Sequence, residues 1–77
     1  MLDFGDYVRT KNTGSALIEG CIGKIVGVAN HVSPDLVFYI IMLPRPMVDP
    51  LLCMAVQAVV LPTPCLERCR EMTDEQW

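Results

Sequence analysis

The segment that most constrains the fold is residues 20–29, which places three glycines among β-branched residues. Side chains alternate between the two faces of a strand, so Gly23, Ile25 and Gly27 share one face. Such small residues around a single isoleucine allow another strand to cross closely, or allow the chain to bend at a barrel corner. We therefore predict that this segment is the second strand of a small, strongly bent β-sheet.

The other predicted strands are short runs of alternating or continuously apolar residues between turn-forming residues. They cover residues 7–10, 36–43, 51–61 and 66–70. A single helical turn is predicted at residues 62–66. These elements predict an all-β, five-stranded SH3-like barrel over residues 1–70, followed by an acidic C-terminal tail at residues 71–77.

Three segments between the strands are predicted to be irregular. Residues 30–35 end in a Ser-Pro-Asp turn signal. Residues 44–50 contain three prolines, which cannot donate to a sheet, so we predict a stiff connection outside the ladder. Residues 12–19 are predicted to form a loop whose apolar part, residues 16–18, folds back over the barrel or onto a neighbouring chain.

The apolar content predicts self-association. Of the 77 residues 52% are hydrophobic and only 19% are charged, although a chain of this length has little interior. Residues 36–43 are apolar on both faces, which is unusual for a strand with one wet face. We therefore expect a homo-oligomer, a dimer or a tetramer, formed through the third and fourth strands. The expected interface residues are Val37, Phe38, Ile40, Ile41, Met54 and Val56.

Few residues suggest chemistry. The predicted polar features of a small-molecule cleft between subunits are Gln57, Tyr39 and His31. His31 has no evident acidic partner, so we interpret it as a solvated histidine and predict no catalytic residue. Cys65 and Cys69 have the spacing of half a zinc site, but buried thiols are the simpler interpretation, and we predict no metal site.

Composition argues against two classes of partner. The net charge is −3 and the six basic residues are scattered, which disfavours nucleic-acid binding. No signal peptide is evident, and the apolar runs are too short to cross a membrane as helices. We therefore expect a cytoplasmic protein with reduced cysteines in or near its core.

Three segments resemble the type II, plasmid-type dihydrofolate reductases, which are themselves SH3-like. They are Gly5-x-x-Val8-Arg9-x-Lys11, Gly23-Lys24-Ile25-Val26-Gly27, and Pro62 with Leu66-Glu67-Arg68. In that family four copies form a ring, and a Val-Gln-Ile-Tyr strand of each copy lines a pore that holds folate and NADPH. The match to this strand is Val56-Gln57, after a two-residue shift that keeps the strand face.

The chain also looks like the small proteins encoded by integron gene cassettes. Because no tyrosine follows Gln57, we expect a non-enzymatic binding or interaction module that needs no cofactor. The alternative that the resemblance implies is an NADPH-dependent reductase with a symmetric pore.

Overall fold

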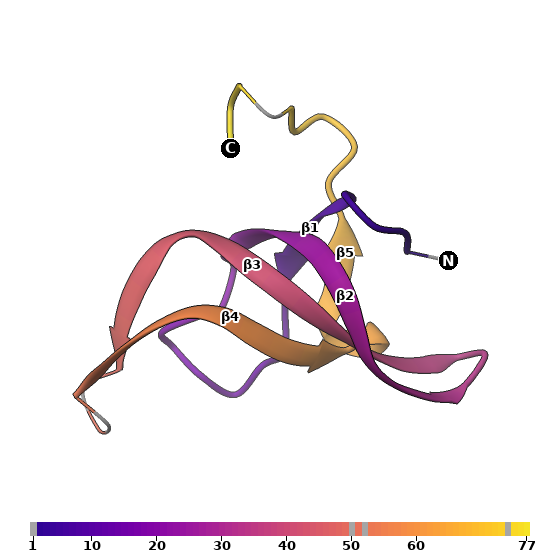
Figure 1. Ribbon diagram of the computed structural model, residues 1–77, viewed down its shortest axis with the longest axis horizontal. Helices are drawn as coiled ribbons and strands as arrows, with labels where there is room; N and C mark the ends of the chain where they lie inside the picture. Colours follow the sequence, from indigo (N-terminus) through magenta and orange to yellow (C-terminus); the bar gives the residue numbers. More distant parts are fainter. Residues whose placement is uncertain (1, 50, 52, 74) are drawn as a thin grey trace.

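The computed structural model describes residues 2–49, 51, 53–73 and 75–77, and its regular secondary structure consists of strands and one 3-10 turn. One antiparallel sheet has the order β4-β3-β2-β1-β5, and Figure 1 shows how its long strands curve. The elements are β1 (Tyr7–Thr10), β2 (Ile22–Ser33), β3 (Leu36–Asp49), β4 (Met54–Pro62), the 3-10 turn η1 (Thr63–Cys65) and β5 (Leu66–Arg68).

The all-β class, the number of strands, the helical turn and the short last strand are confirmed. The fourth strand was predicted to begin at residue 51, but it begins at Met54, because residues 51 and 53 belong to the β3–β4 turn and residue 52 lies outside the described residues. A closed barrel is not confirmed, because β4 and β5 stand at the two edges of the sheet. The turn η1 is held against β3 by Thr63, whose Oγ1 accepts from the Val37 amide at 3.0 Å and donates to the Val37 carbonyl at 3.1 Å. This contact fixes the direction in which the chain leaves β4 and enters β5.

The β2–β3 hairpin is longer than the sequence predicts. The ladder continues through His31 paired with Val37 and Ser33 paired with Leu36, so only Pro34 and Asp35 form the turn. The pairing register shifts three times along this hairpin. Each shift adds local twist, which bends the two strands. The prediction of a loop over residues 30–35 was therefore wrong for its first four residues, since extended partners on β3 keep them in the ladder.

The prediction that residues 44–50 lie outside the sheet was also wrong for residues 44–49, since β3 runs on to Asp49, and position 50 lies outside the described residues. Met42 pairs with Ala58, and the next pair is Met47 with Val56. The prolines at positions 44 and 46 fall in the unpaired bulge between these two pairs. A proline has no amide hydrogen to donate, but a residue in a bulge does not need one.

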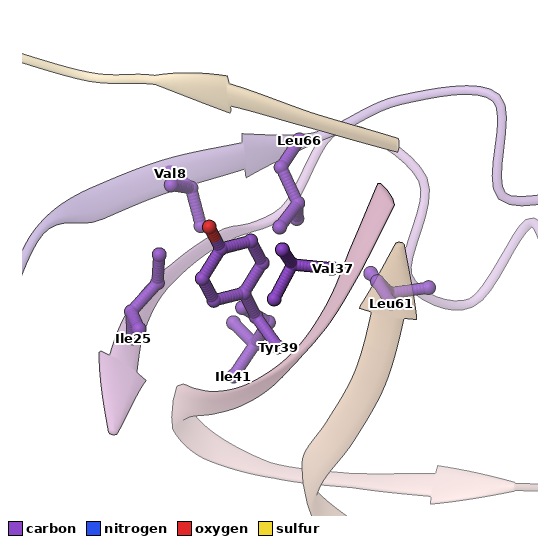
Figure 2. Packing of buried hydrophobic residues seen from close by; sticks show 7 residues of the cluster. All are labelled: Val8, Ile25, Val37, Tyr39, Ile41, Leu61 and Leu66. Carbon is purple, nitrogen blue, oxygen red and sulfur yellow. The ribbon is translucent and has the colours of Figure 1, made fainter. Parts of the chain in front are cut away.

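The core lies on the concave side of the sheet and draws on every strand. Figure 2 shows the Tyr39 ring at its centre, with side chains from β1, β2, β4 and β5 around it. The cluster consists of Val8, Ile25, Val37, Tyr39, Ile41, Leu61 and Leu66. Burying an aliphatic side chain of this size contributes about 1.5–3 kcal/mol. The alternate residues of β3 therefore supply the main hydrophobic stabilisation of a single chain.

The loop between β1 and β2 is tied to the sheet by Thr10, which is 1% exposed. Its hydroxyl contacts the Ile18 carbonyl and accepts from the Cys21 amide at 3.1 Å. Ile18 packs against the core. The expectation that residues 16–18 fold back onto the same chain is confirmed for Ile18.

Glu19 organises the exposed end of this loop. Its carboxylate accepts from the Thr13 amide at 2.9 Å, the Thr13 hydroxyl at 2.7 Å and the Asn12 amide at 2.9 Å. These hydrogen bonds, those of Thr13 first, lower the pKa of Glu19 from its ordinary value of 4.5. Hydrogen bonds to the ionised form favour that form, so the carboxylate holds the loop only while it is charged.

A pH-dependent difference is expected between the wild type and Glu19→Gln. Because the folded pKa is depressed, the contribution of Glu19 is complete above pH 4.5 and is lost as the pH falls through the folded value. In urea titrations, the variant should have a lower free energy of unfolding than the wild type at pH 7. This difference between the two proteins should become smaller below pH 4.5. A difference in the free energy of unfolding that stays constant down to pH 2 would contradict a stabilising role of the ionised Glu19 carboxylate.

Candidate functional site

Two of the three predicted ligand-binding residues line one cavity. His31 on β2 and Tyr39 on β3 border a space of about 200 Å³, whose other walls are mostly apolar and include Ile25 and Val37. His31 is exposed, whereas Tyr39 is 3% exposed and belongs to the core. The histidine therefore lies at the rim of this cavity and the tyrosine ring at its base.

Gln57 lies elsewhere, beside the bulge of β3. Its Nε2 donates to the Leu43 carbonyl at 3.4 Å. Gln57 is exposed, on the edge strand β4, where it faces the unpaired residues of the bulge. Its amide therefore helps to satisfy the backbone where the ladder is interrupted. The structure does not bring Gln57 to the cavity of His31 and Tyr39.

The predicted interface residues fall on two different faces. Val37 and Ile41 are 3% and 0% exposed and lie in the core of the single chain. Phe38 and Ile40 alternate with them and point to the opposite face, where they are half-buried. On β4, Met54 is exposed and Val56 is half-buried. A surface for a second chain is therefore available at Phe38, Ile40, Met54 and Val56, but the side chains of Val37 and Ile41 are already covered.

A continuous apolar surface forms where β3 and β4 run side by side. Residues directly opposite each other share a face, and the pairs on the convex side are Phe38 with Pro62, Ile40 with Val60, and Met42 with Ala58. We call these six residues the outer apolar face. Val60 is 51% exposed, and Ala58 is also exposed. Charged side chains are absent from this set and from the whole of β4.

A second cavity, of about 290 Å³, combines apolar and cationic walls. Leu2, Pro34 and Leu66 supply apolar surface, and the guanidinium groups of Arg68 and Arg70 supply the charge. Arg68 Nη2 lies 3.0 Å from Asp6 Oδ2. No sequence pattern predicts this cavity, because its walls come from segments that are distant in the sequence: the N-terminal segment, the β2–β3 turn, β3, η1, and β5 with the turn after it.

The four cysteines do not form a site among the described residues. No disulfide joins them, and no group of three histidine, cysteine or acidic residues is placed to hold a metal ion in the part of the chain that the structure describes. Cys21, Cys65 and Cys69 are half-buried, as expected for thiols near the core. Cys53 is exposed because it lies at the β3–β4 turn. The expectation that the cysteines lie in or near the core was therefore wrong for Cys53.

The acidic tail ends in a contact that the sequence did not suggest. The Trp77 ring centroid lies 5.8 Å from that of Tyr7, and Lys24 Nζ lies 5.5 Å from the Tyr7 centroid and 5.8 Å from the Trp77 centroid. A cation over aromatic rings contributes about 0.5–1 kcal/mol at exposed sites. The last residue therefore packs against the β1–β2 part of the sheet.

Within the described residues, no helix is long and apolar enough to cross a membrane. No known protein family, curated protein or solved structure matches this chain. The resemblance to type II dihydrofolate reductases and to integron-cassette proteins therefore stays a prediction.

Proposed function

We propose that this chain is a self-associating interaction module, in which the edge strand β4 pairs with β4 of a second copy. The observation that carries the proposal is that β4 is an edge strand of nine residues with no charged side chain. An edge strand presents unpaired backbone donors and acceptors. Soluble proteins ordinarily protect such edges with charges, prolines or bulges, and β4 carries only one proline, at its end.

Two copies of β4 can pair about a two-fold axis. Antiparallel pairing of identical strands gives a symmetric interface, in which each residue meets the same set of residues on the partner. If the axis passes at the centre of β4, Ala58 meets its own counterpart, and its small side chain permits close approach. The two outer apolar faces then lie next to each other in one continuous sheet. In this arrangement Val60 packs beside Val56 of the partner subunit, and the two outer apolar faces form one wider apolar surface.

The order of the elements supports the proposal of an SH3-like topology. A short first strand, a bent hairpin, a 3-10 turn and a short last strand beside the first follow one another along the chain. Such small all-β modules present their edge strands and loops to partners. We propose on this basis a binding role rather than catalysis, since the described polar residues converge on no reaction centre.

The proposal is tested by Val60→Lys, which places a cation on the outer apolar face without touching the core. In sedimentation velocity runs, we expect the wild type to sediment as a dimer and the variant as a monomer at the same concentration. A lysine at position 60 would lose water beside the apolar Val56 of the partner subunit, which disfavours pairing, and lysine is a residue that protects natural edges. Circular dichroism should show that the variant keeps the wild-type fold.

The matched control is Val32→Lys. Val32 is 55% exposed, similar to Val60, but it lies near the tip of the β2–β3 hairpin, away from β4. This variant should sediment like the wild type. If both variants sediment like the wild type, or if both dissociate, pairing through β4 is wrong.

A further inference from the structure

The cavity between the N-terminal segment, the β2–β3 turn and β5 has an amphipathic lining. Leu2 is half-buried and packs against the core, and Leu66 is 7% exposed, so their side chains form a fixed apolar wall. Arg68 and Arg70 border the same space. Both arginines also border an adjoining, more polar cavity of about 360 Å³. The two guanidinium groups therefore lie between an apolar and a polar compartment.

The charges at this boundary leave one cation available to an anion. Arg68 is paired with Asp6 at 3.0 Å, and Asp6 also accepts from the Asp3 amide at 2.9 Å, which holds the carboxylate in place. Arg70 is exposed and makes no ion pair with any carboxylate that the structure describes. A planar guanidinium offers a two-pronged donor that matches a carboxylate. One cation suits a monoanion better than a dianionic phosphate group.

We propose that this cavity binds a small organic carboxylate that carries an apolar tail. The tail lies along Leu2 and Leu66 in the apolar compartment. The carboxylate pairs with Arg70 at the boundary. The ion pair with Asp6 fixes the position of the Arg68 guanidinium, which borders the same cavity. Apolar walls with a few polar groups at one end are the usual composition of small-molecule sites. This site lies within one chain and does not depend on pairing through β4.

The test is isothermal titration calorimetry of the full chain with octanoate and with its uncharged analogue octanamide. We expect octanoate to bind with one site per chain and more tightly than octanamide. Arg70→Gln should weaken octanoate binding about threefold to tenfold, since a partly exposed charge-assisted pair is lost. The same variant should bind octanoate and octanamide equally, because the preference for the anion depends on Arg70.

The matched control is Arg9→Gln. Arg9 is an exposed arginine on β1 that lines neither cavity, and its removal changes the net charge by the same amount. This variant should keep the wild-type affinity for octanoate. Absence of octanoate binding at millimolar concentration would overturn the proposal. Equal loss in the Arg9 and Arg70 variants would also overturn it, because a general charge effect would then explain the binding.

A repeat of the titration with Val60→Lys separates this inference from the proposed self-association. The cavity is complete in one chain, so octanoate should bind this variant as it binds the wild type. Binding to the wild type alone would place the ligand between subunits and would overturn the site described here. The association state itself has no bearing on the Arg70 comparison, since all its variants keep β4 unchanged.

Discussion

Replacing Ile41 with aspartate is expected to unfold the chain, whereas the same change at the neighbouring Ile40 should leave it folded. Ile41 is 0% exposed and lies in the core. An unpaired carboxylate in that position destabilises by about 4–5 kcal/mol or more. A single hydrophobic core in a chain of 77 residues rarely supplies more than about 3–5 kcal/mol of net stability, so little or none of it would remain.

Ile40 lies on the outer apolar face, where aspartate is hydrated in the monomer. We expect a loss of only about 1 kcal/mol in stability, together with a weaker dimer, because aspartate at position 40 no longer packs against Val60 on the pairing strand. Circular dichroism melting curves and sedimentation velocity on both variants distinguish these effects. Unfolding by both substitutions would mean that both faces of β3 are buried within one chain. The outer apolar face would then not be available to a second copy.

Gly23→Ala is expected to lower the free energy of unfolding by about 3 kcal/mol, because Gly23 lies in close contact with residues of β3. A Cβ at this position would overlap Ile41 Cγ2 and would lie 3.0 Å from the Met42 carbonyl oxygen. Neither neighbour moves easily, since Ile41 is fully buried and the carbonyl belongs to the backbone. Overpacking of this kind costs about 1–3 kcal/mol and sometimes more. The change is measured by urea titration.

Gly27→Ala on the same strand provides the control. Its Cβ would meet the end of the Ile40 side chain at 3.3 Å, and this half-buried side chain can shift. We expect the free energy of unfolding to change by less than about 1 kcal/mol, because alanine also lowers the entropy of the unfolded chain. If Gly23→Ala were as stable as Gly27→Ala, the close approach of β2 and β3 at Gly23 would be wrong.

The sequence was sufficient for the strand count because the local signals agree with the tertiary structure. Glycines at positions 23 and 27 indicated close packing on β2, and the structure places Ile41 and Ile40 against them. The prediction that the two glycines share one face was wrong, because a bulge between Ile25 and Gly27 turns Gly27 to the outer face. The run of apolar residues in β3 indicated burial, and its alternate residues form the core. The prolines at positions 44 and 46 misled the prediction because their effect depends on register. Only the pairing with β4 shows that they fall in a bulge.

The site was less predictable, since cavities are formed by residues that are distant in the sequence. His31 and Tyr39 meet because the β2–β3 ladder extends past residue 30, and the sequence was interpreted as a loop there. Arg70 and Leu2 line one cavity because β5 and β1, next to which they lie in the sequence, pair in the sheet. The contact between Trp77 and Tyr7 likewise joins residues that are distant in the sequence, so no local pattern predicts it.

Static light scattering of the wild-type chain over a wide range of protein concentration tests the proposed self-association most directly. Pairing through β4 predicts a molar mass of two chains of 8.6 kDa each, which falls toward that of one chain on dilution. The Val60→Lys variant should show the mass of one chain throughout. A wild-type mass of one chain at every concentration would contradict the proposal. A mass of four chains would also contradict a simple two-fold pair, and it would instead favour the ring that the reductase resemblance implies.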